Sequence, residues 1–82
     1  MSLVELTKEI VLSLAKNKDM VSVKEFETDE ENAILIQVMV SNDDIGRIIG
    51  KEGRNAKAIR TLVQASSFLK ENKKVKINID SF

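Results

Sequence analysis

The chain has 82 residues, and its 13 basic and 13 acidic side chains give a formal net charge of zero. It contains no cysteine and no histidine, which excludes disulfides, thiolate chemistry, and the commonest general base and transition-metal ligand. We therefore expect neither an enzyme nor a cofactor or metal site. A chain of this length predicts one domain over residues 1–82.

The first predicted element is a helix over residues 2–17. Its apolar residues recur at helical spacing, at Leu3, Leu6, Ile10, Val11 and Leu14. Ser2 can cap this helix, with Glu5 three residues on to complete a capping box. The acidic N-terminal stretch lacks the blocks of a signal peptide, and no apolar run reaches the roughly 18 residues of a membrane span. We therefore expect a cytoplasmic protein that does not bind a membrane.

The next two predicted elements form an antiparallel hairpin. Residues 21–28 alternate imperfectly and include β-branched side chains, which predicts an edge strand. The acidic turn Asp29–Asn32 follows. The almost wholly apolar run AILIQVMV, Ala33–Val40, predicts a central strand buried on both faces.

Two helices joined at glycines are predicted next. Ser41 can accept hydrogen bonds from the free N–H groups of a short helix, and Asp43 and Asp44 suit its positive end. Gly50 ends that helix, and a long helix follows over Arg54–Lys70. The predicted core face of the long helix comprises Ala56, Ile59, Leu62, Val63, Ser66 and Leu69, and its opposite face comprises Arg54, Lys57, Thr61 and Gln64.

The last predicted element is a half-buried strand, in which Val75, Ile77 and Ile79 alternate with polar residues. The order α-β-β-α-α-β predicts a two-layer α+β fold, with a three-stranded mixed sheet and three helices on one face. The two-helix connection lets the central and last strands run parallel.

One stretch, Ile45–Leu62, holds all three glycines of the chain, Gly46, Gly50 and Gly53. It also holds five of the 13 basic residues and a single acid, Glu52, so the rest of the chain has an acidic excess. A domain polarised in this way can present a basic face to a polyanion while the whole stays neutral. The alternative is that the basic run is only a solvated face.

The turn Gly50–Gly53 between the two helices has the properties of a phosphate site. Glycine allows a left-handed or crowded backbone, and the free N–H groups of the following helix can point outward. The spacing excludes a P-loop, because only three residues separate Gly46 from Gly50 and Glu52 replaces the magnesium-binding hydroxyl. It also excludes a dinucleotide fingerprint. A helix-hairpin-helix DNA motif and a plain αα-turn remain open.

The same residues resemble a known RNA-binding motif. Ile48–Gly53, IIGKEG, resembles the signature of the KH (K-homology) domain, and the element order is that of the type II arrangement. The longer run Asp44–Arg60, DIGRIIGKEGRNAKAIR, is similar to the motif of the small bacterial single-KH proteins of the KhpA family. The match of 17 residues in register, within a matching order of elements, implies a single type II KH domain over essentially the whole chain.

KH domains clamp four nucleotides with this loop. The resemblance implies that the backbone around Gly50–Gly53 approaches the phosphates, with Lys51 and Arg54 as cations and with Arg47 and Lys57 lining the approach. The bases would lie in an apolar groove between the two middle helices and the central strand. Its candidate residues are Ile45, Ile48, Ile49, Ala56 and the strand residues 34–40. Each can equally be core, and for Ile49 and the strand we favour core. The predicted RNA-binding set is Arg47, Ile48, Gly50, Lys51, Glu52, Gly53, Arg54 and Lys57.

Two residues depart from the general KH pattern. Ala56 stands where isoleucine is frequent, which makes one wall of the groove shallower. Glu52 places an anion beside the expected phosphates and partly offsets Lys51. We therefore expect a modest affinity for RNA.

The resemblance implies single-stranded RNA as the ligand, in RNA chaperoning or post-transcriptional control that is linked in some bacteria to cell elongation and division. It also raises two protein partners, a second copy of the chain and a larger KH-domain protein (KhpB, also called Jag or EloR). The main alternative function is therefore that of a protein-interaction module, for which Phe68 and Phe82 are candidate contacts. Phe68 can equally tuck under the last strand. Duplex DNA binding by a helix-hairpin-helix is the remaining nucleic-acid alternative.

Overall fold

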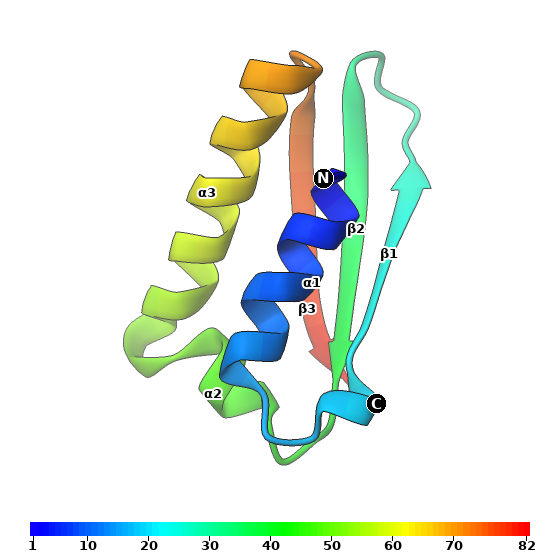
Figure 1. Cartoon of the computed structure of the whole chain (residues 1–82). Helices are drawn as coiled ribbons and strands as arrows, with labels where there is room; N and C mark the ends of the chain where they lie inside the picture. Colours follow the sequence, from blue (N-terminus) through cyan, green and yellow to red (C-terminus); the bar gives the residue numbers. More distant parts are fainter.

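The computed structural model describes residues 1–82 as a three-stranded sheet with its helices on one face (Figure 1). The strands are β1 (Ser22–Glu27), β2 (Ala33–Val40) and β3 (Lys74–Ser81), and β2 lies in the centre. β1 pairs antiparallel with β2, whereas β3 pairs parallel with β2. The predicted hairpin, mixed sheet and α+β class are confirmed.

The N-terminal helix α1 spans Leu3–Leu14 and has the predicted capping box between Ser2 and Glu5. Leu3, Thr7 and Val11 are buried along one side of it. A short 3-10 turn, η1 (Lys18–Met20), leads into β1. The helix therefore ends before the predicted limit at residue 17, because Ala15 already has an extended backbone.

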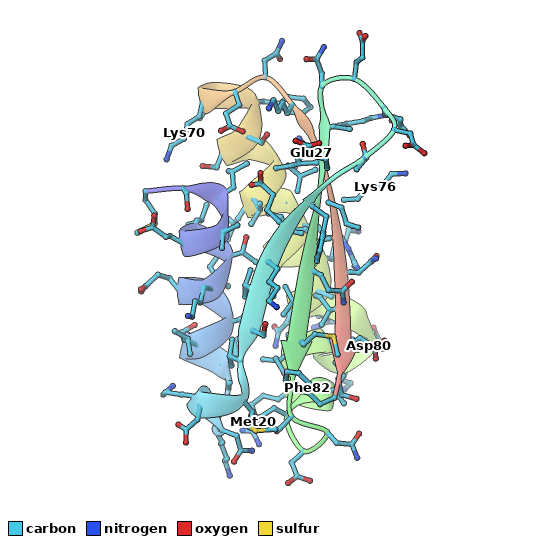
Figure 2. The ribbon with its side chains drawn as sticks, turned by 90° about the vertical axis from the view of Figure 1, so that its right-hand side faces the viewer. Met20, Glu27, Lys70, Lys76, Asp80 and Phe82 are labelled. Carbon is cyan, nitrogen blue, oxygen red and sulfur yellow. The ribbon has the colours of Figure 1, made fainter.

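Strand β2 is buried on one face only, so the prediction of burial on both faces was wrong. Its side chains toward the helices are at most 5% exposed, and these are Ile34, Ile36, Val38 and Val40. The alternate residues Leu35, Gln37 and Met39 are half-buried. The reason is topological, since all the helices cover the same face and leave the other one open. Figure 2 shows Lys76 and Asp80 of β3 on this open side.

Helix α3 spans Arg54–Lys70, as predicted. Its buried residues are Ala56, Ile59, Val63 and Ser67. Leu62 and Leu69, which were predicted to lie in the core, are 56% and 88% exposed. The buried arc of α3 is narrower than the projection assumed, because one side of the helix packs on β3 and α1, and nothing covers the next arc.

The short helix α2 (Ile45–Ile49) and the 3-10 turn η2 (Lys51–Gly53) connect β2 to α3. Both α2 and α3 pack against β3, whereas α1 packs against β1. In Figure 1 the junction of α2 and α3 lies at the end of the sheet opposite the β1–β2 turn. None of the helices has the length and apolar character that crossing a membrane requires.

Candidate nucleic-acid interface

The start of α2 is tied to the segment that follows α1. The Asp44 carboxylate is 1% exposed and accepts hydrogen bonds from the backbone N–H groups of Asn17 at 2.9 Å and Lys16 at 3.2 Å. These bonds, that of Asn17 first, hold the pKa of the Asp44 carboxyl below its ordinary value, although its burial acts in the opposite direction. Asp44 thus anchors the glycine-rich segment to the rest of the fold.

The prediction that the Ser41 side chain caps α2 was wrong. The Ser41 hydroxyl accepts a hydrogen bond from Nδ2 of Asn17 at 3.0 Å, and only its backbone carbonyl accepts from the N–H groups of Asp44 and Ile45. Asp44 occupies the N-cap position without a side-chain bond to the helix. The contact with Asn17 joins residues that are 24 positions apart, so local sequence patterns could not reveal it.

The loop between α2 and α3 has a left-handed backbone at three of its four residues. Gly50 has φ 78° and ψ 172°, Glu52 has φ 57° and ψ 24°, and Gly53 has φ 74° and ψ 16°. The N–H of Gly53 donates to the carbonyl of Gly50 at 3.1 Å, which closes a tight turn. Two of these positions are glycines, as positive φ values favour.

The N-termini of both η2 and α3 lie in this loop. No side chain accepts a hydrogen bond from the N–H groups of Lys51 or Glu52, and no side chain caps the N-terminus of α3. Successive N–H groups in a turn with left-handed residues form a concavity that suits a phosphate. The phosphate site expected at Gly50–Gly53 stays a prediction.

The side chain of Asn55 contacts both this loop and the end of α2. Its Nδ2 donates to the carbonyl oxygen of Arg47, near the end of α2, at 2.9 Å. A Cβ at Gly50 would lie 2.8 Å from Cγ of Asn55, so the amide is packed directly against the glycine. Sequence reasoning did not single out Asn55, because its partners lie in a different helix and in the turn.

The predicted cations surround the loop with few competing anions. Arg47 forms an ion pair with Asp44 at 3.6 Å, and Arg54 forms one with Glu52 at 3.8 Å. Lys51 and Lys57 are exposed and form no ion pair. Glu52 was expected to offset Lys51, but its partner is Arg54, and both of these side chains are more than 70% exposed.

The apolar candidates divide between core and surface. Ile48 is fully buried and Ala56 is 4% exposed, so both belong to the core. Ile49 is 37% exposed beside the loop, which contradicts the assignment of this residue to the core. The strand next to α2 and α3 is β3 rather than β2, so the groove predicted along the central strand is occupied by core side chains.

Two shallow hollows follow α3 away from the loop. The first begins at the loop and is lined by Arg54, Lys57, Ala58, Thr61 and Leu62. The second lies between α3 and β3 and is lined by Arg60, Thr61, Gln64, Ala65, Phe68 and Val75. Phe68 is 54% exposed at the second hollow. It therefore flanks the first residues of the last strand but is not covered by them.

Two polar side chains of α3 bind the free edge of β3. The Gln64 amide donates to the carbonyl of Lys73 and accepts from the N–H of Val75, both at 2.9 Å. The Arg60 guanidinium reaches the carbonyl of Ile77 at 3.4 Å. Gln64 was predicted only to face solvent, and its half-buried position shows that α3 uses polar residues to protect an edge strand.

Comparisons with known proteins agree with this fold. The family model described as "KhpA/KhpB, KH domain" matches residues 4–79. RNA-binding protein KhpA of Caldanaerobacter subterraneus subsp. tengcongensis is 45% identical over 75 residues, which cover 92% of this chain and 96% of that protein. The proteins of the same name from Clostridium perfringens and Listeria monocytogenes are 45% and 43% identical, again over 92% of this chain and at least 95% of their own length.

Two solved structures share the architecture at low sequence identity. Era of Aquifex aeolicus has a TM-score of 0.71 and 21% identity, and the match covers 98% of this chain and 30% of that one. Era in complex with MgGDPNP and a segment of 16S ribosomal RNA has a TM-score of 0.68 and 22% identity, and the match covers 96% and 29% of the two chains. At this identity the likeness shows the fold alone.

Proposed function

Because this chain belongs to the KhpA/KhpB family of KH domains, we propose that it binds single-stranded RNA through the loop Gly50–Gly53. The observation that carries the proposal is the positive φ of Gly50, Glu52 and Gly53, in a loop where no side chain caps the N–H groups of Lys51 and Glu52. The family is one of RNA-binding domains, and the relatives are named RNA-binding proteins.

In this mechanism the backbone N–H groups donate to phosphate oxygens, and Lys51 supplies the nearest free cation. Arg47, Arg54 and Lys57 extend the positive surface on either side of the loop. Helix α3 contains no acidic residue over its whole length, so a polyanion laid along it meets no repulsion from that helix. Such backbone contacts are independent of sequence, and they position the RNA without specifying it.

The bases would lie beside Ile49 and along the two hollows on α3. Unstacked bases can turn into a shallow groove, whereas the bases of a duplex cannot, which favours single-stranded RNA. Arg60 is placed to donate to a base edge if its long bonds to Ile77 are exchanged. Phe68 adds one aromatic face for stacking. This location replaces the groove along the central strand.

A charge reversal within the loop tests this function. Lys51→Asp combined with Glu52→Asp places two carboxylates where phosphates would bind, and we expect it to abolish binding to a fluorescent single-stranded RNA. Lys8→Asp with Glu9→Asp is a matched control, because it makes the same chemical change at an exposed pair on α1. If the loop variant binds RNA as well as the control does, the loop does not carry the function. A preference for duplex DNA in the same assay would favour the helix-hairpin-helix alternative.

A second candidate function is self-association through α3, or pairing with a larger KH-domain protein. The observation that favours it is an exposed apolar stripe, in which Leu62 is 56% exposed and Leu69 is 88% exposed, with Ala65 between them and Ala58 one turn before Leu62. Residues at these intervals of three and four lie on one side of a helix, as in helix pairs. Two copies joined there would bind one RNA with added avidity.

Sedimentation velocity across a concentration series tests the stripe. Leu62→Asp should shift the profile toward the monomer, whereas Phe26→Asp, at another exposed apolar residue on the open face of the sheet, should leave it unchanged. A wild-type protein that stays monomeric at high concentration would remove this candidate. The family resemblance supports a cellular role as a cytoplasmic RNA chaperone or post-transcriptional regulator. Sequencing of RNA crosslinked to the protein in cells would identify its targets.

A further inference from the structure

The side-chain amide of Asn55 does not stabilise its own helix, α3. Asn55 is the second residue of α3, a place where the helix dipole favours a carboxylate. Asparagine is a poor helix former, and its side chain makes no bond to the first turn of α3. It reaches eight positions back instead and donates to the carbonyl of Arg47 at 2.9 Å.

The same amide forms the wall against which Gly50 lies. A Cβ built on Gly50 would be 2.8 Å from Cγ and 2.9 Å from Nδ2 of Asn55. The backbone of Gly50, at φ 78° and ψ 172°, lies in a region that essentially only glycine adopts. One side chain therefore contacts both the last turn of α2 and the first residue of the loop, and the three atoms nearest to that Cβ position all belong to Asn55.

We propose that Asn55 is a positioning residue, which keeps the N–H groups of Lys51 and Glu52 aimed at a phosphate by bracing Gly50 and the end of α2. The inference rests on the proposed RNA binding, because it assigns a role in that site. Asn55 itself need not touch the RNA. An aspartate at this position would place a carboxylate next to the Arg47 carbonyl and beside the phosphate, and both would repel it. An amide can donate to the carbonyl and carries no negative charge.

The variants Asn55→Ala and Asn55→Asp separate positioning from folding. The bond of Asn55 lies at an exposed site, so water can take its place and the protein should remain folded. Without the side-chain contacts of Asn55, the loop samples other conformations and binds the phosphate more weakly. We expect the affinity for single-stranded RNA to fall about tenfold in Asn55→Ala, since one hydrogen bond to a charged oxygen is worth at least that factor. Asn55→Asp should bind more weakly still.

The dependence of the dissociation constant on salt provides a readout that a purely structural role would not move. Loss of one phosphate contact lowers the slope of log affinity against log salt by about 0.7 for a single strand. Fewer folded molecules would lower the apparent affinity without changing that slope. Amide exchange at Lys51 and Glu52 should also speed up in Asn55→Ala. Asn78→Ala is the matched control, because Asn78 is exposed on β3 and forms no side-chain hydrogen bond.

The outcomes distinguish this inference from the function on which it rests. If the double loop variant loses RNA but Asn55→Ala retains wild-type affinity and slope, the positioning role is wrong and the RNA site stands. If neither the double loop variant nor Asn55→Ala affects binding, the site itself is wrong. A lower affinity and slope in Asn55→Ala, with Asn78→Ala unchanged, supports the inference. A conservative Asn55→Gln variant that regains part of the affinity would add to that support.

Discussion

The carboxylate of Asp44 accepts a hydrogen bond of 2.9 Å from the backbone N–H of Asn17, a residue 27 positions earlier in the chain. This contact joins the end of the α1 segment to the first residue of the glycine-rich motif. The Asp44 carboxylate also accepts from the N–H of Lys16 and pairs with the side chain of Arg47, so one buried carboxylate links the segment after α1 to α2. The carboxylate of Asp44 thus fixes the start of α2 to the segment after α1, beside the bond between Asn17 and Ser41.

Asp44→Asn should destabilise the protein in a way that depends on pH. The folded-state pKa of Asp44 is lowered from its ordinary value of 3.8, chiefly by the N–H of Asn17. The carboxylate thus contributes stability above that ordinary value and loses it as the pH falls through the lower, folded value. The variant should be clearly less stable than wild type at pH 7, and the difference should shrink below about pH 4.

Urea denaturation at a series of pH values measures this difference. Asp43→Asn serves as the control, because its exposed side chain makes no hydrogen bond in the structure and has the same charge. A constant gap between Asp44→Asn and wild type from pH 7 to about pH 3 would contradict the assignment of the effect to the ionised carboxylate.

The three glycines should respond to alanine in a definite order. Gly50→Ala combines a strained backbone with a Cβ 2.8 Å from Asn55, so we expect a loss of at least about 1–3 kcal/mol in the free energy of unfolding. Gly53→Ala has open space around it and bears only the left-handed backbone, which costs about 1–2 kcal/mol. Gly46→Ala lies within α2 in open space and should be neutral or stabilising by up to about 1 kcal/mol.

Chemical denaturation of the three alanine variants ranks these effects. Gly46→Ala is the internal control, since it makes the same change in the same motif without a positive φ. Equal losses at Gly46 and Gly50 would show that the backbone conformation of the loop is not what requires glycine.

Truncation to alanine of two neighbouring apolar residues of α3 should change the stability of the protein by very different amounts. Ile59 is 1% exposed, so Ile59→Ala should cost about 2–5 kcal/mol of stability through lost burial and the cavity left behind. Leu62 is 56% exposed, so Leu62→Ala should change stability by no more than about 0.5 kcal/mol in the monomer. Denaturation at low protein concentration compares them, since self-association would add a concentration-dependent loss at Leu62. A large loss at Leu62 under those dilute conditions would mean that the core face is wider than the structure has it.

Neutralising Glu52 should strengthen RNA binding. Its carboxylate is exposed, pairs only with the exposed Arg54, and lies in the loop that would approach the phosphates. Removal of one like charge at a distance of about 4 Å in water is worth about 1 kcal/mol, or roughly fivefold in affinity, and the gain should fade as salt is raised. A fluorescence titration of Glu52→Gln at two salt concentrations measures this gain.

Glu31→Gln controls for the change in net charge. Glu31 is exposed in the β1–β2 turn, at the far end of the molecule from the loop (Figure 1). If both variants gain the same affinity, the effect reflects the overall charge and not the loop.

Much of the fold follows from local patterns. The capping box of α1, the strand at Ala33–Val40, the glycine that ends α2 and the limits of α3 at Arg54 and Lys70 were each predicted from residues close together in the chain. The loop and its cations were also found this way, because glycine spacing and local charge are properties of a short segment. Their role in RNA binding stays a prediction, with family membership in its support.

The predictions that were wrong concerned which faces of the helices and strands are buried. The sequence predicted that Leu62 and Leu69 lie in the core, and it favoured the core for Ile49. It also predicted that β2 is buried on both faces. Only the arrangement of α1 and α3 on one side of the sheet decides these points. Periodicity gives the direction of a side chain from its element, but not whether another element lies there.

The sequence by itself determined the elements, their order and the position of a basic, glycine-rich turn, because these depend on backbone preferences and spacing within a few residues. The tertiary structure alone decided that β3 lies beside the motif, that Asp44 fastens the motif to Asn17, and that Asn55 braces Gly50. Those contacts join residues through packing and long-range hydrogen bonds, and no local preference encodes them. The conformation of this loop therefore depends on the whole fold.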